Sequence, residues 1–135
     1  NKTSTFPSVF PRNTLYFFKN VMAKIKLSRE TKIILRFLRS LMVEVKIYER
    51  LCDSEKYLKA KIAASKHTYL HKQTLEVVKG QKKLYQHRMD FYARYMNPEC
   101  LNSFNLKHVT WLLASGTRYT ERRAMIILDF KIPKR

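Results

Sequence analysis

Glycine and proline are both scarce in this chain of 135 residues, which contains two glycines and four prolines. Folds built only from β-strands need many tight turns, and these two residue types supply most of them. An all-β architecture is therefore excluded. A glycine-rich phosphate-binding loop is excluded as well, because the two glycines, Gly80 and Gly116, are far apart in the sequence.

Acidic residues are the second shortage. Ten Asp and Glu residues stand against 28 Lys and Arg residues, which gives a formal net charge of +18. Repulsion among so many like charges destabilises a compact chain unless a partner neutralises it. The hydrophobic fraction of 45% is still large enough to build a core, so the chain is not a disordered basic tail. We expect a polyanionic partner, with nucleic acid preferred over an anionic membrane surface.

Long apolar runs and cysteine pairs are missing too. No run approaches 18 apolar residues, so no transmembrane helix is predicted. Cys52 and Cys100 form no CxxC motif, and two cysteines are too few for a disulfide framework. We therefore expect free thiols in a reducing compartment.

Residue patterns that support catalysis are also absent from the sequence. His67 and His71 are one helical turn apart, but Thr68 occupies the position where a zinc protease carries glutamate. The neighbouring Lys66 and Lys72 would repel a metal cation. The acids are spread thinly and form no general acid–base pair. We expect no enzyme activity, catalytic residue, bound metal, cofactor or small-molecule substrate.

Residues 1–13 are predicted to form an extended basic arm, because Pro7 and Pro11 prevent a helix there. Its two phenylalanines suit stacking on RNA bases, and they equally suit a tether to the protein's own core. The first acid of the chain is Glu30, and basic segments that lack acids are typical of organellar import. The expected location is the mitochondrion, with the nucleus or the cytoplasm as alternatives.

A helical region is predicted for residues 14–97 from apolar residues at three- and four-residue spacing. It begins with a short helix over residues 14–26. A second helix over residues 28–51 starts at a capping serine and carries a broad apolar face. A corner at residues 51–54 then leads into a long helix over residues 54–96, antiparallel to the second.

The predicted long helix carries an apolar stripe. Leu70, Val77, Leu84 and Phe91 recur at intervals of seven and so share one side of a helix. We interpret them as a protein interface, whose partner is either this chain or a neighbouring subunit. Gly80 is placed on the polar side, where it weakens the helix by about 1 kcal/mol relative to alanine.

Residues 98–135 are predicted to form a small helical and irregular segment. The Asn97-Pro98 pair ends the long helix, and a short helix from Ser103 stops at Ser115-Gly116. Residues 124–132 suit a strand and a helix equally. The predicted fold class is thus all-α: an elongated, long helical hairpin with a short C-terminal helix and extended basic termini.

The predicted RNA-binding residues are cations that lie off the apolar faces of the expected helices. Lys and Arg side chains on such faces can neutralise phosphates. The set comprises Lys19, Arg36, Lys66, Lys72, Lys79, Lys82, Lys83, Arg94, Arg118, Arg122 and Arg123.

These observations predict a structural RNA-binding subunit of a large ribonucleoprotein, most plausibly a mitochondrial ribosome. Its expected partners are ribosomal RNA and neighbouring protein subunits, because long basic helices and basic arms suit a surface of packed phosphates. One alternative is a structural accessory subunit of a membrane-bound mitochondrial complex. A DNA-binding protein is a further alternative, although no helix-turn-helix spacing stands out.

Overall fold

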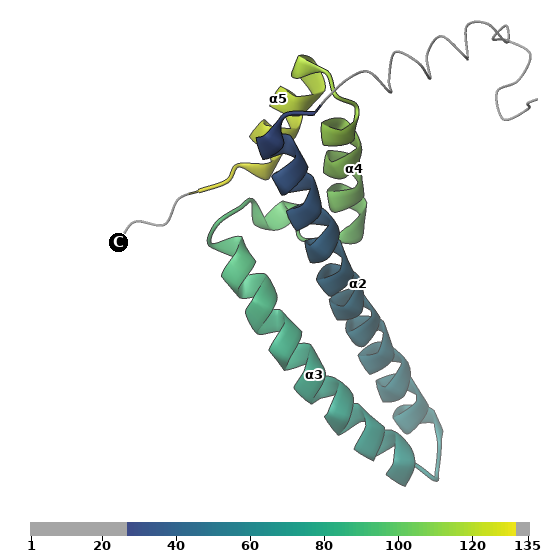
Figure 1. Cartoon of the computed structure of the whole chain (residues 1–135). Coiled ribbons are helices and arrows are strands. Elements are labelled where there is room, and N and C mark those ends of the chain that lie inside the picture. The colour runs from purple at the N-terminus through teal and green to yellow at the C-terminus, as the bar shows by residue number, and fades with distance from the viewer. Residues whose placement is uncertain (1–26, 132–135) are drawn as a thin grey trace, which may run out of the picture.

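The computed structural model describes residues 27–131, and within this range it contains helices and no strands. The elements in chain order are α2 (Arg29–Ala64), α3 (Tyr69–Ala93), a single 3-10 turn η1 (Pro98–Cys100), α4 (Ser103–Ala114) and α5 (Arg118–Leu128) (Figure 1). The predicted all-α fold class is confirmed. The predicted arm over residues 1–13, the helix over residues 14–26 and the basic C-terminal residues 132–135 lie outside the described range.

Helix α2 begins where the sequence predicts and ends later. The side chain of Ser28 accepts a hydrogen bond from the backbone N–H of Thr31 at 3.1 Å, and Glu30 lies in the first turn, where a carboxylate suits the helix dipole. The helix then continues without interruption to Ala64. The corner predicted at residues 51–54 is wrong, and so is the single long helix over residues 54–96.

The spacing of the apolar residues explains why α2 continues past residues 51–54. Leu51, Glu55, Leu58 and Ile62 continue the inward face at three- and four-residue intervals, with Leu51 and Leu58 buried. Asp53 and Ser54 are exposed on the outside, where they do not interrupt a helix. The chain reverses instead at residues 65–68, between the C-cap of α2 and the first residue of α3.

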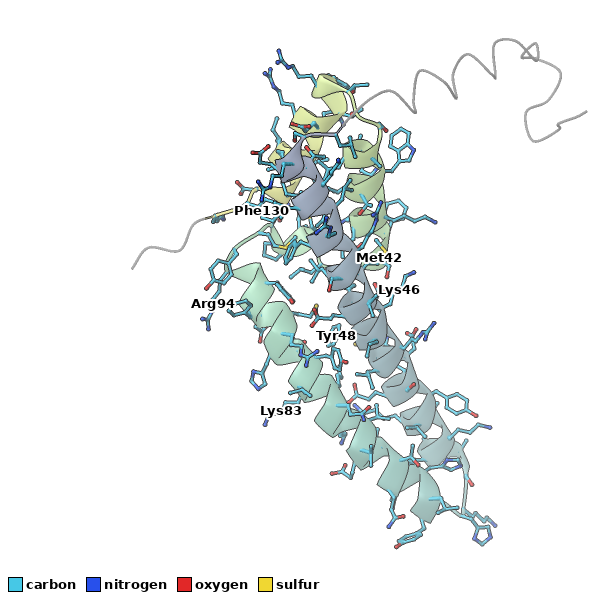
Figure 2. The ribbon with its side chains drawn as sticks, viewed as in Figure 1. Met42, Lys46, Tyr48, Lys83, Arg94 and Phe130 are labelled. Atoms are coloured by element: carbon cyan, nitrogen blue, oxygen red, sulfur yellow. The ribbon has the colours of Figure 1, made fainter. Side chains whose placement is uncertain are left out.

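Helices α2 and α3 run antiparallel and are joined by this short connection (Figure 1). Polar contacts link them at three successive levels. Glu44 Oε2 accepts a hydrogen bond from the Tyr92 hydroxyl at 2.8 Å, the Tyr48 hydroxyl donates to Gln86, and Lys82 Nζ lies 2.7 Å from Glu55 Oε1. Figure 2 shows Tyr48 between the two helices.

The main core lies where the N-terminal half of α2 meets α4, α5 and the end of α3. The side chains buried almost completely there are Leu38, Leu41, Val45, Met96, Leu106, Val109, Leu113 and Leu128. Burying each such leucine or valine contributes roughly 1.5–3 kcal/mol, so this end of the molecule supplies most of the apolar stabilisation. The other end of the hairpin buries only Leu51, Leu58 and Leu75.

The segment after α3 follows the sequence predictions closely. The helix ends before Asn97-Pro98, and Asn97 then donates its backbone N–H to the Leu128 carbonyl at 2.8 Å and its Nδ2 to the Ile127 carbonyl at 3.1 Å. The stop at Ser115-Gly116 is confirmed, with Gly116 at a φ of 76°. These bonds attach the end of α3 to the end of α5.

The ambiguity between strand and helix over residues 124–132 is resolved in favour of helix for residues 124–128, whereas residues 129–131 form neither and residue 132 lies outside the described range. Helix α5 runs to Leu128 and stops at Asp129, which adopts a left-handed conformation with a φ of 45°. The backbone N–H of Lys131 then donates to the Tyr95 carbonyl at 2.7 Å. The alternation of apolar and polar residues that suits a strand includes Phe130 and Lys131, which lie after the end of the helix.

Both cysteines are free, as predicted. Cys52 is half-buried on α2, whereas Cys100 is buried and its Sγ donates to the Ile127 carbonyl at 3.4 Å. Burial, followed by the charge of Glu99, raises the pKa of the Cys100 thiol above its usual value. Cys100 is therefore a packing residue held in its neutral form.

Candidate nucleic-acid interface

The outer side of α2 carries a row of exposed cations, which we call the α2 basic stripe. Its spacing of three, four or seven residues, with one step of eleven, keeps the row on one side of the helix. The exposed acids of the same helix are Glu30 and Asp53. The stripe consists of Lys32, Arg36, Arg39, Lys46, Arg50 and Lys61.

No member of the α2 basic stripe forms an ion pair within residues 27–131. Lys61 is held over the ring of Tyr57, with 5.6 Å between Nζ and the ring centroid. From Lys32 to Lys61 the stripe extends about 44 Å at 1.5 Å per residue. It therefore offers a long, uncompensated cationic surface to a polyanion.

Several acids of the chain connect helices inside the fold and therefore leave the stripe unneutralised. Glu44 faces α3, where Arg88 Nη1 lies 3.2 Å from its Oε1. Glu49 Oε2 accepts the backbone N–H of Ser103 at the start of α4 at 3.1 Å. Glu121 of α5 accepts the hydroxyl of Thr31 at 2.9 Å. Each of these carboxylates joins two helices.

Lys82 belongs to the same internal group. Its hydrogen bond to Glu55 lowers the pKa of the Glu55 carboxyl and raises the pKa of the Lys82 ammonium, so both groups stay charged across the neutral range. Lys82 is half-buried between α2 and α3 and lies apart from the exposed cations of α3. Among the predicted RNA-binding residues, Lys82 is the one whose ion pair connects two of the described helices.

Helix α3 carries a second cationic surface, the α3 basic face, made of Lys72, Lys79, Lys83 and Arg94. All four are exposed, and only Lys79 approaches an acid in the part of the chain that is described, at 3.7 Å from Glu76. Figure 2 shows Lys83 and Arg94 pointing away from α2, whereas Lys46 projects from the opposite side of the hairpin. Cations thus point outward from both helices.

The remaining predicted RNA-binding residues lie at the two ends of the molecule. Lys66 is exposed in the connection between α2 and α3. Arg118, Arg122 and Arg123 are exposed at the start of α5, with the Arg123 guanidinium 5.9 Å from the ring centroid of Tyr119. Lys19 lies outside the described residues. The structure therefore distributes the predicted set over several surfaces and does not gather it into one patch.

The predicted apolar stripe is not buried within the described part of the chain. Leu70, Val77, Leu84 and Phe91 all have more than half of their surface exposed, from 51% for Phe91 to 73% for Leu70. The residues of α3 that face α2 are Leu75, Val78, Lys82, Tyr85, Met89 and Tyr92, which lie on another side of the helix. Gly80 lies at the edge of the apolar stripe, where an added Cβ would meet no atom within 4 Å.

Two features of the structure go beyond the sequence predictions. The predicted RNA-binding set contains only Arg36 of the α2 basic stripe, although the spacing of the other five cations already indicates a common side. Phe104 and Trp111, two large apolar residues of the predicted short helix, are exposed on α4. The signal there was the i, i+3, i+7 spacing of Leu106, Val109 and Leu113, which points Trp111 the other way.

Within residues 27–131, no group of three or more histidine, cysteine, aspartate or glutamate side chains is arranged to hold a metal ion. None of the described helices combines the length and the apolar character that a membrane crossing requires. Comparison of the chain with protein-family models, curated proteins and solved structures finds no match.

Proposed function

We propose that this protein is a structural RNA-binding subunit of a large ribonucleoprotein, with a mitochondrial ribosome as the specific assembly. The observation that carries the proposal is the α2 basic stripe, six exposed cations on one side of a helix without an ion-pair partner in the described residues. Self-repulsion along such a row is relieved when phosphates neutralise it and counterions are released.

The position of the cations on both helices supports an assembly role. Lys46 of α2 and Lys83 of α3 project from opposite sides of the hairpin, so phosphates can approach the molecule from more than one direction (Figure 2). A protein enclosed by folded RNA meets phosphates in this way, whereas a protein on one straight duplex meets them from one side. The mitochondrial setting is supported by the basic N-terminal sequence, whose first acid is Glu30.

Neighbouring protein subunits are the second class of proposed partner. The apolar stripe is exposed along α3, and its members lie at the seven-residue spacing that suits pairing with another helix. The same stripe favours the alternative function, an accessory subunit of a membrane-bound mitochondrial complex. In that alternative the stripe packs on another subunit, and the cations face anionic lipid headgroups.

Two charge-matched variants test the proposed function. Lys46→Gln with Arg50→Gln removes two cations from the α2 basic stripe. Lys59→Gln with Lys131→Gln removes two cations that already lie 3.7 Å and 3.8 Å from Glu55 and Asp129. The net charge falls by the same amount in both, so any difference reflects position.

Binding to a structured RNA is measured for each variant over a range of salt concentrations. The α2 variant is expected to bind more weakly, with a slope of log affinity against log salt reduced by about 1.4 to 1.8 in magnitude, because each phosphate contact contributes about 0.7 to 0.9. The control variant is expected to keep the wild-type slope. Equal slopes for both variants and the wild type, or binding to anionic vesicles without RNA affinity, would overturn the proposal.

A further inference from the structure

The exposed side of α4 carries two large aromatic rings with two nitrogen-bearing side chains between them. Phe104 and Trp111 are 82% and 64% exposed, and Lys107 and His108 are exposed as well. These four residues, at i, i+3, i+4 and i+7, share one side of the helix, and we call them the α4 platform. Phe104 and Trp111 are about 10 Å apart along the helix axis.

We propose that the α4 platform binds unpaired nucleobases, with Phe104 and Trp111 stacking on bases and Lys107 contacting the phosphates between them. This inference rests on the proposed function and specifies its ligand as single-stranded RNA at this one surface. The axial separation of Phe104 and Trp111 is one that a few unpaired nucleotides can span, so the platform suits a short stretch of single strand.

The fold holds the platform rigidly. The opposite side of α4 is Leu106, Val109, Leu112 and Leu113, all at most 4% exposed in the main core. At the start of the helix, Asn102 Oδ1 accepts the backbone N–H of Asn105 at 2.9 Å, and Glu49 accepts the N–H of Ser103. A preorganised stacking surface loses little conformational entropy when a base binds to it.

The charge of the platform favours a nucleic acid over a protein. No acid is present in α4, and Lys107 forms no ion pair within the described residues. An apolar protein surface laid across both rings would bury the Lys107 ammonium between them without a counter-charge, which is costly. A nucleotide strand supplies a phosphate for the ammonium and base faces for the rings.

Single strands are favoured over duplexes for a geometric reason. The faces of paired bases are covered by their neighbours in a stack, so aromatic side chains reach them only in loops, bulges and ends. The α2 basic stripe does not require unpaired bases, because cations can contact the phosphates of any RNA. The two surfaces are therefore separable by experiment.

The chain contains a single tryptophan, so the fluorescence of the full-length protein reports on Trp111 alone when the excitation wavelength lies beyond the absorption of the eight tyrosines. Three probes are added in turn: a short single-stranded RNA, a fully paired RNA duplex with the same number of phosphates, and an abasic strand of the same length as the single strand. Quenching is expected with the single strand and much less with the other two, since only the single strand offers free base faces.

Affinity for the labelled single strand is then compared for Trp111→Ala, Trp111→Phe and Ile126→Ala. Ile126 is 70% exposed on α5 and provides a matched control for the loss of an exposed apolar side chain. Trp111→Ala is expected to weaken binding by about 5- to 150-fold, the range measured for removal of one stacked aromatic residue. Trp111→Phe, which keeps a ring, is expected to retain most of the affinity, and Ile126→Ala all of it.

Three results would overturn the platform. If RNA binds but the fluorescence is unchanged and Trp111→Ala binds the single strand normally, the platform is wrong and the proposed function stands. A blue shift of the emission with rising protein concentration in the absence of RNA would show that a second copy covers Trp111. If no RNA of any kind binds, both the proposed function and the proposed role of the platform are wrong.

Discussion

The ammonium of Lys82 lies 2.7 Å from the carboxylate of Glu55, and this contact joins α3 to α2 outside the main core. Lys59, one turn further along α2, approaches the other oxygen of Glu55 at 3.7 Å. Both cations keep the pKa of Glu55 below its ordinary value of 4.5, the hydrogen bond from Lys82 being the larger cause. The end of the α2–α3 pair away from the main core has few buried side chains, and this polar contact helps to hold its two helices together.

The first prediction concerns the pH dependence of this contact. Because the pKa of Glu55 is lowered on folding, its contribution to stability is complete above the unfolded-state pKa of 4.5 and is lost as the pH falls through the lower folded-state pKa. The melting temperature of Glu55→Gln is expected to lie below that of the wild type at pH 7, with the difference disappearing in acid. Circular dichroism melts from pH 7 down to pH 3 measure this.

The control for that experiment is Glu76→Gln, which removes an acid whose contact with Lys79 at 3.7 Å lies within one exposed helix. Such a pair contributes little to stability, so this variant is expected to track the wild type throughout. A difference between Glu55→Gln and the wild type that stays constant across the whole pH range would show that the carboxylate charge is not the cause.

The second prediction separates the two sides of α3. Met89 is 5% exposed in the main core, whereas Leu84 is 54% exposed. Met89→Asp buries an unpaired charge and is expected to unfold the protein or lower its free energy of unfolding by several kcal/mol. Leu84→Asp is expected to change it by less than about 1 kcal/mol. Urea denaturation of both variants checks this, and a collapse caused by Leu84→Asp alone would reverse our assignment of the two sides.

The third prediction concerns Gly80. This residue is exposed within α3, and an added Cβ would meet no atom within 4 Å. Gly80→Ala is therefore expected to raise the free energy of unfolding by about 0.5–1 kcal/mol, because glycine has the greater conformational freedom in the unfolded chain. A lower melting temperature for this variant in thermal denaturation would mean that α3 bends at residue 80 and that the bend is required.

The fourth prediction concerns the α3 basic face. Replacing Lys72, Lys79 and Lys83 together by glutamate is expected to weaken binding to structured RNA by at least 10-fold at low salt, since three phosphate contacts become repulsions. The three side chains are exposed, so the helical signal in circular dichroism is expected to stay at the wild-type level. Unchanged RNA affinity would remove this face from the interface and leave the α2 basic stripe as the candidate.

Much of this fold follows from local sequence signals. Ser28 as the cap of α2, the break at Asn97-Pro98 and the stop at Gly116 each depend on the chemistry of one or two residues, and all three are confirmed. The turn between α2 and α3 has no glycine or proline to mark it. The predicted turn therefore falls at Asp53 and Ser54, which are good helix caps but here remain exposed within a helix.

The sides of α3 were harder to predict for a different reason. Two apolar rows run along it, one containing Leu84 and the other containing Met89, and the sequence alone gives no means of deciding which one faces α2. The choice depends on the register of α3 against α2, which tertiary contacts such as Glu44 with Tyr92 determine. The exposure of Trp111 is also hard to predict, because a large apolar residue beside Leu112 and Leu113 resembles a core residue.

The most direct test of the account is the salt dependence of RNA binding by the full-length wild-type protein. If phosphates neutralise the six cations of the α2 basic stripe, a plot of log affinity against log salt concentration should be linear, with a slope of about −4 or steeper. A flat plot, or a protein that remains folded and soluble at low salt without binding any RNA, would contradict the central claim that a polyphosphate surface compensates the excess of positive charge.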